Sequence, residues 1–161
     1  MTASVFDLFK LGVGPSSSHT MGPMTAGVMF VERLRAAGKL PSVARVETRL
    51  YASLALTGKG HATDRAVILG LMGFSPAQLD PDAGEAALAQ TKATQWMMLG
   101  GEVGIGFDEA RDIVFAGHER LPQHPNALTF SAFSADGALL MERTYFSVGG
   151  GFVRDESEMG R

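Results

Sequence analysis

The stretch VARVETRLYAS, residues 43–53, alternates between two kinds of side chain with a period of two. This period places successive side chains on opposite faces of a β-strand. One face takes apolar residues and the other takes charged residues and a tyrosine: Ala44, Val46, Leu50 and Ala52 against Arg45, Glu47, Arg49 and Tyr51. The stretch therefore predicts a half-buried strand.

One helix is predicted before this strand in the sequence and another after it. Residues 24–37 carry one polar stripe on an otherwise apolar segment, which is typical of a mostly buried helix that ends at Gly38. Residues 63–72 are apolar almost all round after the first turn, so this second helix belongs in the interior. Thr63 or Asp64 is expected to cap it.

The second half of the chain predicts one more helix and three strands. The Asp-Gly pair inside residues 134–137 is a strong hairpin signal, and Gly100-Gly101 is expected to end the helix. The predicted elements are a peripheral helix at 82–98, a short strand at 112–116 and hairpin strands at 128–133 and 139–148. Together with the first half they indicate an α+β fold, in which buried helices pack on a mostly antiparallel sheet in a single domain.

The composition excludes several classes of protein. With 161 residues, 45% of them hydrophobic and 19% charged, the chain is long and apolar enough for one globular domain. A net charge of −3 without runs of lysine or arginine speaks against nucleic-acid binding. The apolar runs are too short to span a membrane, and no secretion signal is evident, so a cytoplasmic protein is expected. The absence of cysteine excludes disulfides, a thiol nucleophile and thiolate-bound metal within this chain.

The strongest candidate site is the stretch GVGPSSSHTMGP, residues 12–23, directly before the first predicted helix. Its hydroxyl groups and the N–H groups of the helix start could together hold a carboxylate or a phosphate. The polar side chains of this cradle are Ser16, Ser17, Ser18, His19 and Thr20. The alternative is a polar loop with an ordinary helix cap, but one serine would suffice for that purpose.

A second glycine-bearing stretch, TGKGH at residues 57–61, precedes the second predicted helix. His61 could take or give a proton near neutral pH, and the flanking glycines offer little packing reason for an imidazole. Lys59 could counter an anionic substrate or could be a solvated surface lysine. Asp64 could orient His61, although capping is the simpler interpretation.

The remaining histidines carry weaker signals. His118 is followed by two charged residues, Glu119 and Arg120, and is interpreted as a surface residue. His124-Pro125-Asn126 could be a plain turn or part of a site, because asparagine and proline both favour turns. The four histidines form no spacing that is typical of a metal site.

Four stretches of the chain carry a family resemblance. They are SVFDLFKLGVGPSSSHTMGPM at 4–24, GHATDRA at 60–66, HPN at 124–126 and YFSVGGGF at 145–152. Together they resemble the iron–sulfur L-serine dehydratases. Their order and spacing also fit that family, and the similarity spans almost the whole chain.

The resemblance implies the β portion of that enzyme, with residues 1–153 as the β domain and 154–161 as a loose tail or the start of a linker. The family removes water from L-serine, and the product becomes pyruvate and ammonia. It uses a [4Fe–4S] cluster, whose cysteines belong to an α portion, and no pyridoxal phosphate. The resemblance thus implies L-serine and an α portion as partners, and a homo-oligomer is expected.

Roles for individual residues follow from the same resemblance. His61 is assigned as the base that takes the α-proton, with His19 as the alternative base or as an acid for the leaving hydroxide. The residues expected to bind or surround the substrate are Ser16, Ser17, Ser18, Thr20, His124, Asn126, Lys59 and Asp64. A rival interpretation is a non-catalytic carboxylate-binding regulatory domain, since the β portion also resembles the allosteric substrate-binding domain of phosphoglycerate dehydrogenases.

Overall fold

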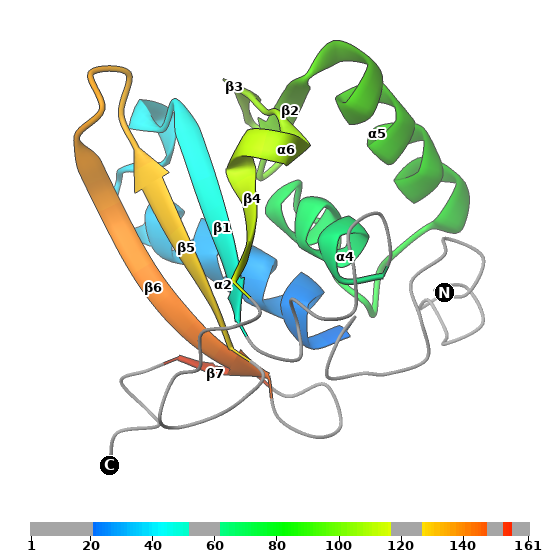
Figure 1. Ribbon diagram of the computed structural model, residues 1–161. Coiled ribbons are helices and arrows are strands. Elements are labelled where there is room, and N and C mark those ends of the chain that lie inside the picture. Colours follow the sequence, from blue (N-terminus) through cyan, green and yellow to red (C-terminus); the bar gives the residue numbers. More distant parts are fainter. Residues whose placement is uncertain (1–20, 52–61, 117–126, 148–152, 156–161) are drawn as a thin grey trace.

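The computed structural model describes residues 21–51, 62–116, 127–147 and 153–155 (Figure 1). Within these ranges the chain forms both helices and strands. The elements are α2 (Met21–Ala36), a short 3-10 helix (Leu40–Ser42), β1 (Arg45–Tyr51), α4 (Ala62–Leu71), α5 (Pro81–Thr94), β2 (Trp96–Leu99), β3 (Val103–Gly106), α6 (Glu109–Asp112), β4 (Ile113–Ala116), β5 (Ala127–Phe133), β6 (Leu139–Ser147) and β7 (Val153–Asp155).

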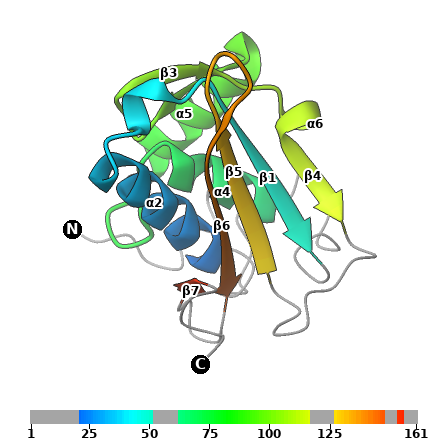
Figure 2. The same cartoon turned by 90° about the vertical axis from the view of Figure 1, so that its left-hand side faces the viewer.

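Five of these strands form one sheet in the order β4-β1-β5-β6-β7. Only the β4–β1 pair is parallel, and the other three pairs are antiparallel. Helices α2 and α4 lie on one face of this sheet, while no described element covers the opposite face (Figures 1 and 2). The structure confirms the predicted α+β fold with buried helices on a mostly antiparallel sheet.

Strand β1 has the alternation that its sequence predicts. Val46, Thr48 and Leu50 are buried beneath the helices, and the residues between them are partly exposed. Arg45 and Glu47 form an ion pair at 2.9 Å on the uncovered face. The strand therefore contributes apolar side chains to the core and charged side chains to the other side of the sheet.

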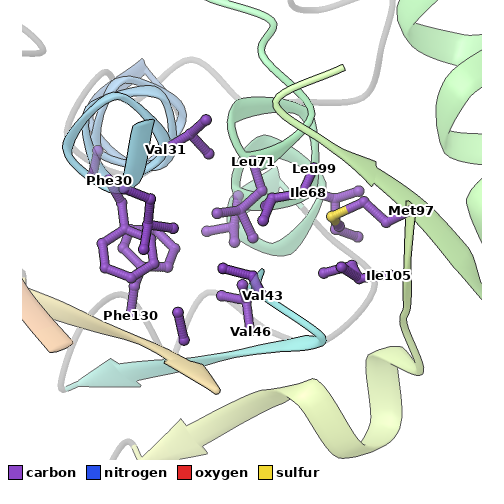
Figure 3. Close-up of a cluster of buried hydrophobic side chains, with 14 of the residues drawn as sticks. Phe30, Val31, Val43, Val46, Ile68, Leu71, Met97, Leu99, Ile105 and Phe130 are labelled. Carbon is purple, nitrogen blue, oxygen red and sulfur yellow. The ribbon is translucent and has the colours of Figure 1, made fainter. Parts of the chain in front are cut away.

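The main core fills the space between the sheet and the helices (Figure 3). Phe30 of α2 stacks on Phe130 of β5 with ring centroids 5.1 Å apart. Ile68 and Leu71 of α4 extend the same cluster toward Met97 of β2 (Figure 3). The helices and the sheet are thus joined by one continuous apolar layer, which is what fixes their relative positions.

The first predicted helix and the hairpin are confirmed. Gly38, two residues after the end of α2, has a φ of +72°, a conformation that ends helices and that glycine adopts readily. The turn between β5 and β6 contains Gly137 with a φ of +88°. The backbone N–H of Gly137 donates to the carbonyl of Ser134 at 2.9 Å, which closes the predicted Asp-Gly turn.

The predicted helix at 82–98 is too long. It ends at Thr94, because Gln95 takes a left-handed conformation and residues 96–99 form strand β2. Gly100 and Gly101 are the centre of a tight turn to β3, and both have positive φ values of +62° and +72°. A turn with two positive φ values is the mirror image of the common type I turn and suits a two-stranded hairpin. This glycine pair therefore reverses the chain between two strands.

Two other expectations also need correction. Helix α4 begins at Ala62, so Thr63 and Asp64 lie inside its first turn and neither of them is the residue before the helix. Arg154 and Asp155, expected in a loose tail, belong to strand β7, which pairs with β6.

Candidate active site at one end of the sheet

The strand register brings several chain segments to the same end of the sheet. Tyr51, the last residue of β1, pairs with Ala116, the last residue of the parallel strand β4. Because β5 runs the other way, its beginning lies beside the end of β1, and Ala127 in turn pairs with Phe146 near the end of β6. Ser147 then pairs with Val153 of β7. Three strands therefore end, and two begin, at this one end.

Helix α2 begins near the same end. It contacts β7, and Figure 2 shows its first turns near β7. The serine-rich stretch 16–20 leads directly into this helix at Met21. Helix α4 follows His61 in the same way, beginning at Ala62, and packs against α2.

The four stretches of the family resemblance all continue into buried described residues. Met24, Ala66 and Ala127 have no exposed surface, and Phe146 is 1% exposed. Met24 and Ala66 belong to one small apolar cluster between α2 and α4. The stretches that contain the candidate site residues are therefore connected to buried parts of the core.

Asp64 is the one candidate site residue within the described ranges. Its side chain is fully buried in the first turn of α4, and one carboxylate oxygen accepts the backbone N–H of Arg65 at 2.9 Å. The bond satisfies one of the N–H groups that a helix start leaves without an intrahelical partner. The other candidates lie outside the described residues: Ser16, Ser17, Ser18, His19, Thr20, Lys59, His61, His124 and Asn126.

A cluster of charged side chains, which the sequence analysis does not predict, lies at the opposite end of β1 and β4. The buried carboxylate of Asp112 accepts bonds from Arg45 Nε at 2.8 Å, from Arg111 at 2.7 and 2.8 Å, and from the N–H of Asp108 at 2.9 Å. Burial on its own would raise the pKa of Asp112, but these bonds outweigh it and hold the pKa below the ordinary value. Since both oxygens are occupied, this carboxylate stabilises the fold and is poorly suited to proton transfer.

Within the described ranges no group of three or more histidine, aspartate or glutamate side chains is placed to bind a metal ion. The whole chain also lacks cysteine, so it has no thiolate to hold an iron–sulfur cluster. None of the helices in the described part is long and apolar enough to cross a membrane.

Comparison with known proteins places these features in a family. The model of the serine dehydratase beta chain family matches residues 4–158. An L-serine dehydratase of Streptomyces coelicolor is 47% identical over 160 residues, which cover 99% of this chain and 35% of the relative. An L-serine dehydratase of Helicobacter pylori is 46% identical over 156 residues, or 97% of this chain and 34% of the relative.

L-serine dehydratase TdcG of Escherichia coli is 44% identical over 158 residues, covering 98% of this chain and 34% of that protein. The chain thus spans about a third of the length of the curated relatives it matches. A family model that covers almost the whole chain, and the agreement of several relatives, lead to one conclusion: the chain belongs to the serine dehydratase beta chain family.

Proposed function

We propose that this chain is the β part of an L-serine dehydratase, which removes water from L-serine in an active site completed by a second, α part. The product of the elimination, 2-aminoacrylate, then hydrolyses to pyruvate and ammonia. The observation that carries the proposal is the match to the serine dehydratase beta chain family over residues 4–158. The convergence of strand ends described above supports the location of the site.

Chain connectivity supports a common location for the candidate residues. Residues 117–126 are joined to Ala116 and Ala127, which end β4 and begin β5 at the same end of the sheet. Residues 52–61 start from Tyr51 at that end, and residues 16–20 lead into α2, which contacts β7. We therefore place the proposed substrate site at this end of the sheet.

Elimination of water from serine needs a base at Cα and a proton for the departing hydroxyl group. In the proposal the imidazole of His61 takes the α-proton, and the electron pair of the broken C–H bond forms the Cα=Cβ double bond. The hydroxyl leaves as water after it receives a proton, for which His19 is the candidate donor. His19 remains the alternative base.

The substrate carboxylate needs donors that hold it without reacting. Ser16, Ser17, Ser18 and Thr20 carry hydroxyl groups directly before α2, and a helix start adds N–H donors and a partial positive charge. We propose that this cradle binds the carboxylate, with Lys59, His124 and Asn126 lining the same cleft. The carboxylate of Asp64 is proposed to orient the imidazole of His61, in addition to its bond at the start of α4.

The [4Fe–4S] cluster of the family is proposed to reside in the α part, because this chain cannot supply its thiolate ligands. When bound, such a cluster offers Lewis-acid chemistry to the substrate hydroxyl. The relatives, about three times as long as this chain, have the additional length that an α part would need.

The test is to combine this chain with the unmatched part of the Streptomyces coelicolor relative without oxygen and to measure pyruvate from L-serine. Pyruvate formation that needs both parts is the expected result. If L-serine binds but no pyruvate forms, and the full-length relative assayed beside them is active, the chain is a carboxylate-binding module and the proposed chemistry is wrong.

A further inference from the structure

An apolar groove of about 600 Å³ lies between α5, strand β2 and the turn that follows α4. None of its lining residues carries a charge. The lining residues are Met72, Phe74, Ala87, Gln90, Thr91, Thr94, Trp96, Met98 and Gly101. The hairpin β2–β3 on its rim lies at the end of the molecule away from β7 (Figures 1 and 2).

Two large apolar side chains on this groove face solvent. Trp96 is 52% exposed and Met98 is 45% exposed, and with Leu139 they are the exposed large apolar residues of the described part. They alternate along β2 with Met97 and Leu99, which are buried in the core. The outward face of the hairpin is therefore apolar, although nothing in the core requires it to be.

Glycines in β3 make room for this apolar face. Gly104 pairs with Met98 and Gly106 pairs with Trp96. A Cβ atom on Gly104 would lie 2.5 Å from the indole nitrogen of Trp96, so the ring rests directly on the backbone of β3. A Cβ on Gly106 would meet nothing within 4 Å. The indole thus forms a flat platform beside the groove.

The hydroxyl groups that line the groove have partners in this chain. Thr94 Oγ1 donates to the carbonyl of Gln90 at 2.7 Å, and Thr91 Oγ1 lies 3.5 Å from the sulfur of Met72. With no charge and its hydroxyl groups already engaged, the groove suits apolar side chains better than a polar ligand.

We infer that the groove binds an apolar segment of the α part of the dehydratase. The inference rests on the proposed function and adds the surface at which the two parts associate. The inference is based on the chain length of the relatives. This chain matches about a third of each of them, so in those proteins about twice its own length of polypeptide accompanies the matched part. Parts that stay together permanently associate through apolar surfaces that resemble a core, and this groove has that character.

The experiment uses the fact that Trp96 is the single tryptophan of the chain. The chain is labelled with 5-fluorotryptophan and titrated with the unlabelled, unmatched part of the Streptomyces coelicolor relative, and sedimentation gives the dissociation constant. The one fluorine resonance is expected to shift as the complex forms. A variant with Trp96→Ser and Met98→Ser is expected to bind at least about tenfold more weakly.

Matched glycine variants separate the platform from general damage to the hairpin. Gly104→Ala should displace the indole and weaken association, whereas Gly106→Ala in the same strand should bind as the wild type does. Equal affinity for all variants, or an unmoved resonance in the complex, overturns the inference. So does a failure of the two parts to associate, or a resonance that shifts with the concentration of the labelled chain alone, since a second copy would then be the occupant.

Pyruvate assays at saturating partner concentration keep this inference separate from the proposed function. If the complex depends on Trp96 and Met98 but forms no pyruvate, the proposed chemistry is wrong and the docking surface is supported. A complex that forms pyruvate with unchanged affinity in the variants contradicts the docking surface alone.

Discussion

Gly27 of α2 and Gly70 of α4 lie against each other where the two helices cross, and neither position has room for a side chain. A Cβ atom on Gly27 would lie 2.9 Å from the carbonyl carbon of Gly70, and a Cβ on Gly70 would overlap the carbonyl oxygen of Met24. The close approach fixes one helix on the other. Both helices follow directly after candidate site stretches, so this contact also fixes the relative positions of the two helices into which those stretches lead.

Replacement of Gly70 by alanine should therefore lower the free energy of unfolding by about 3 kcal/mol, because the new methyl group forces α2 and α4 apart. The intrinsic preference of alanine for helices, about 1 kcal/mol over glycine, offsets only part of this cost. Urea unfolding measures the change. Gly106→Ala, where the Cβ meets open space, is the control, and equal losses in both variants would show that the helix contact is not the cause.

Replacement of Thr48 by valine should stabilise the domain. Among the described residues, the Thr48 hydroxyl is buried and has no hydrogen-bond partner, while the side chain itself is 1% exposed. Valine has nearly the same shape and removes the cost of burying that hydroxyl, so the free energy of unfolding should rise by about 1 kcal/mol. Thr129→Val is the matched control: its hydroxyl bonds to Thr144 at 2.8 Å, and its loss should destabilise the fold.

Asp112 should make the free energy of unfolding depend on pH in the acidic range. Its pKa is held below the ordinary value, so the unfolded chain binds protons more readily, and the stabilisation is lost as the pH falls from the ordinary aspartate pKa through the lowered one. Asp112→Asn should cost about 2 kcal/mol at neutral pH, and the difference from the wild type should shrink below about pH 4. Urea unfolding at several pH values measures this.

Asp80→Asn is the comparison for this experiment, because Asp80 is exposed and its side chain makes no capping bond at the start of α5. The free energy of unfolding of this variant at neutral pH should stay close to that of the wild type. A constant difference between Asp112→Asn and the wild type across the acidic range would contradict the assignment.

His61→Ala should lower kcat of the assembled enzyme by about 100-fold or more, since a positioned general base contributes at least that factor. The comparison is His118→Ala, the histidine that the sequence places among charged neighbours, which should retain wild-type turnover. Initial rates of pyruvate formation decide between them. If His61→Ala keeps its kcat and His19→Ala loses it, the base is His19.

Asp64→Asn distinguishes positioning from simple stabilisation. Asparagine keeps an oxygen for the N–H of Arg65 but loses the charge, so the helix start should survive. If the carboxylate positions His61, kcat should fall about tenfold or more, and the pH profile of kcat/KM should shift. A lowered melting temperature with an unchanged pH profile would mean that Asp64 only stabilises α4.

The sequence predicts those parts of the fold in which one periodicity dominates. The alternation in β1, the apolar faces of α2 and α4 and the Asp-Gly turn after β5 are all read correctly. The predicted helix wrongly includes residues 96–98, because Trp-Met-Met is apolar throughout and fits the end of a helix as well as a strand. Strand β3 was missed because two of its four residues are glycines, whose role is visible only beside Trp96.

The location of the proposed site depends on contacts that no local pattern contains. Tyr51 and Ala116 become neighbours only because β4 pairs in parallel with β1, and α2 meets α4 through long-range contacts such as those of Gly27 with Gly70 and of Met24 with Ala66. The Asp112 cluster is invisible for the same reason, since Arg45 and Asp112 lie 67 residues apart in the chain. Residue types predicted the chemistry, and long-range pairing determines where it can occur.

The position of β1 in the sheet has a consequence for how the domain is made. Both of its neighbours come late: Ile113 follows its partner Thr48 by 65 residues, and β5 begins only at Ala127. While the chain emerges from a ribosome, β1 stays without either neighbouring strand until more than two thirds of the domain has been synthesised. Such distant pairings make folding slow, so the nascent domain should depend on chaperones that shield this strand in the meantime.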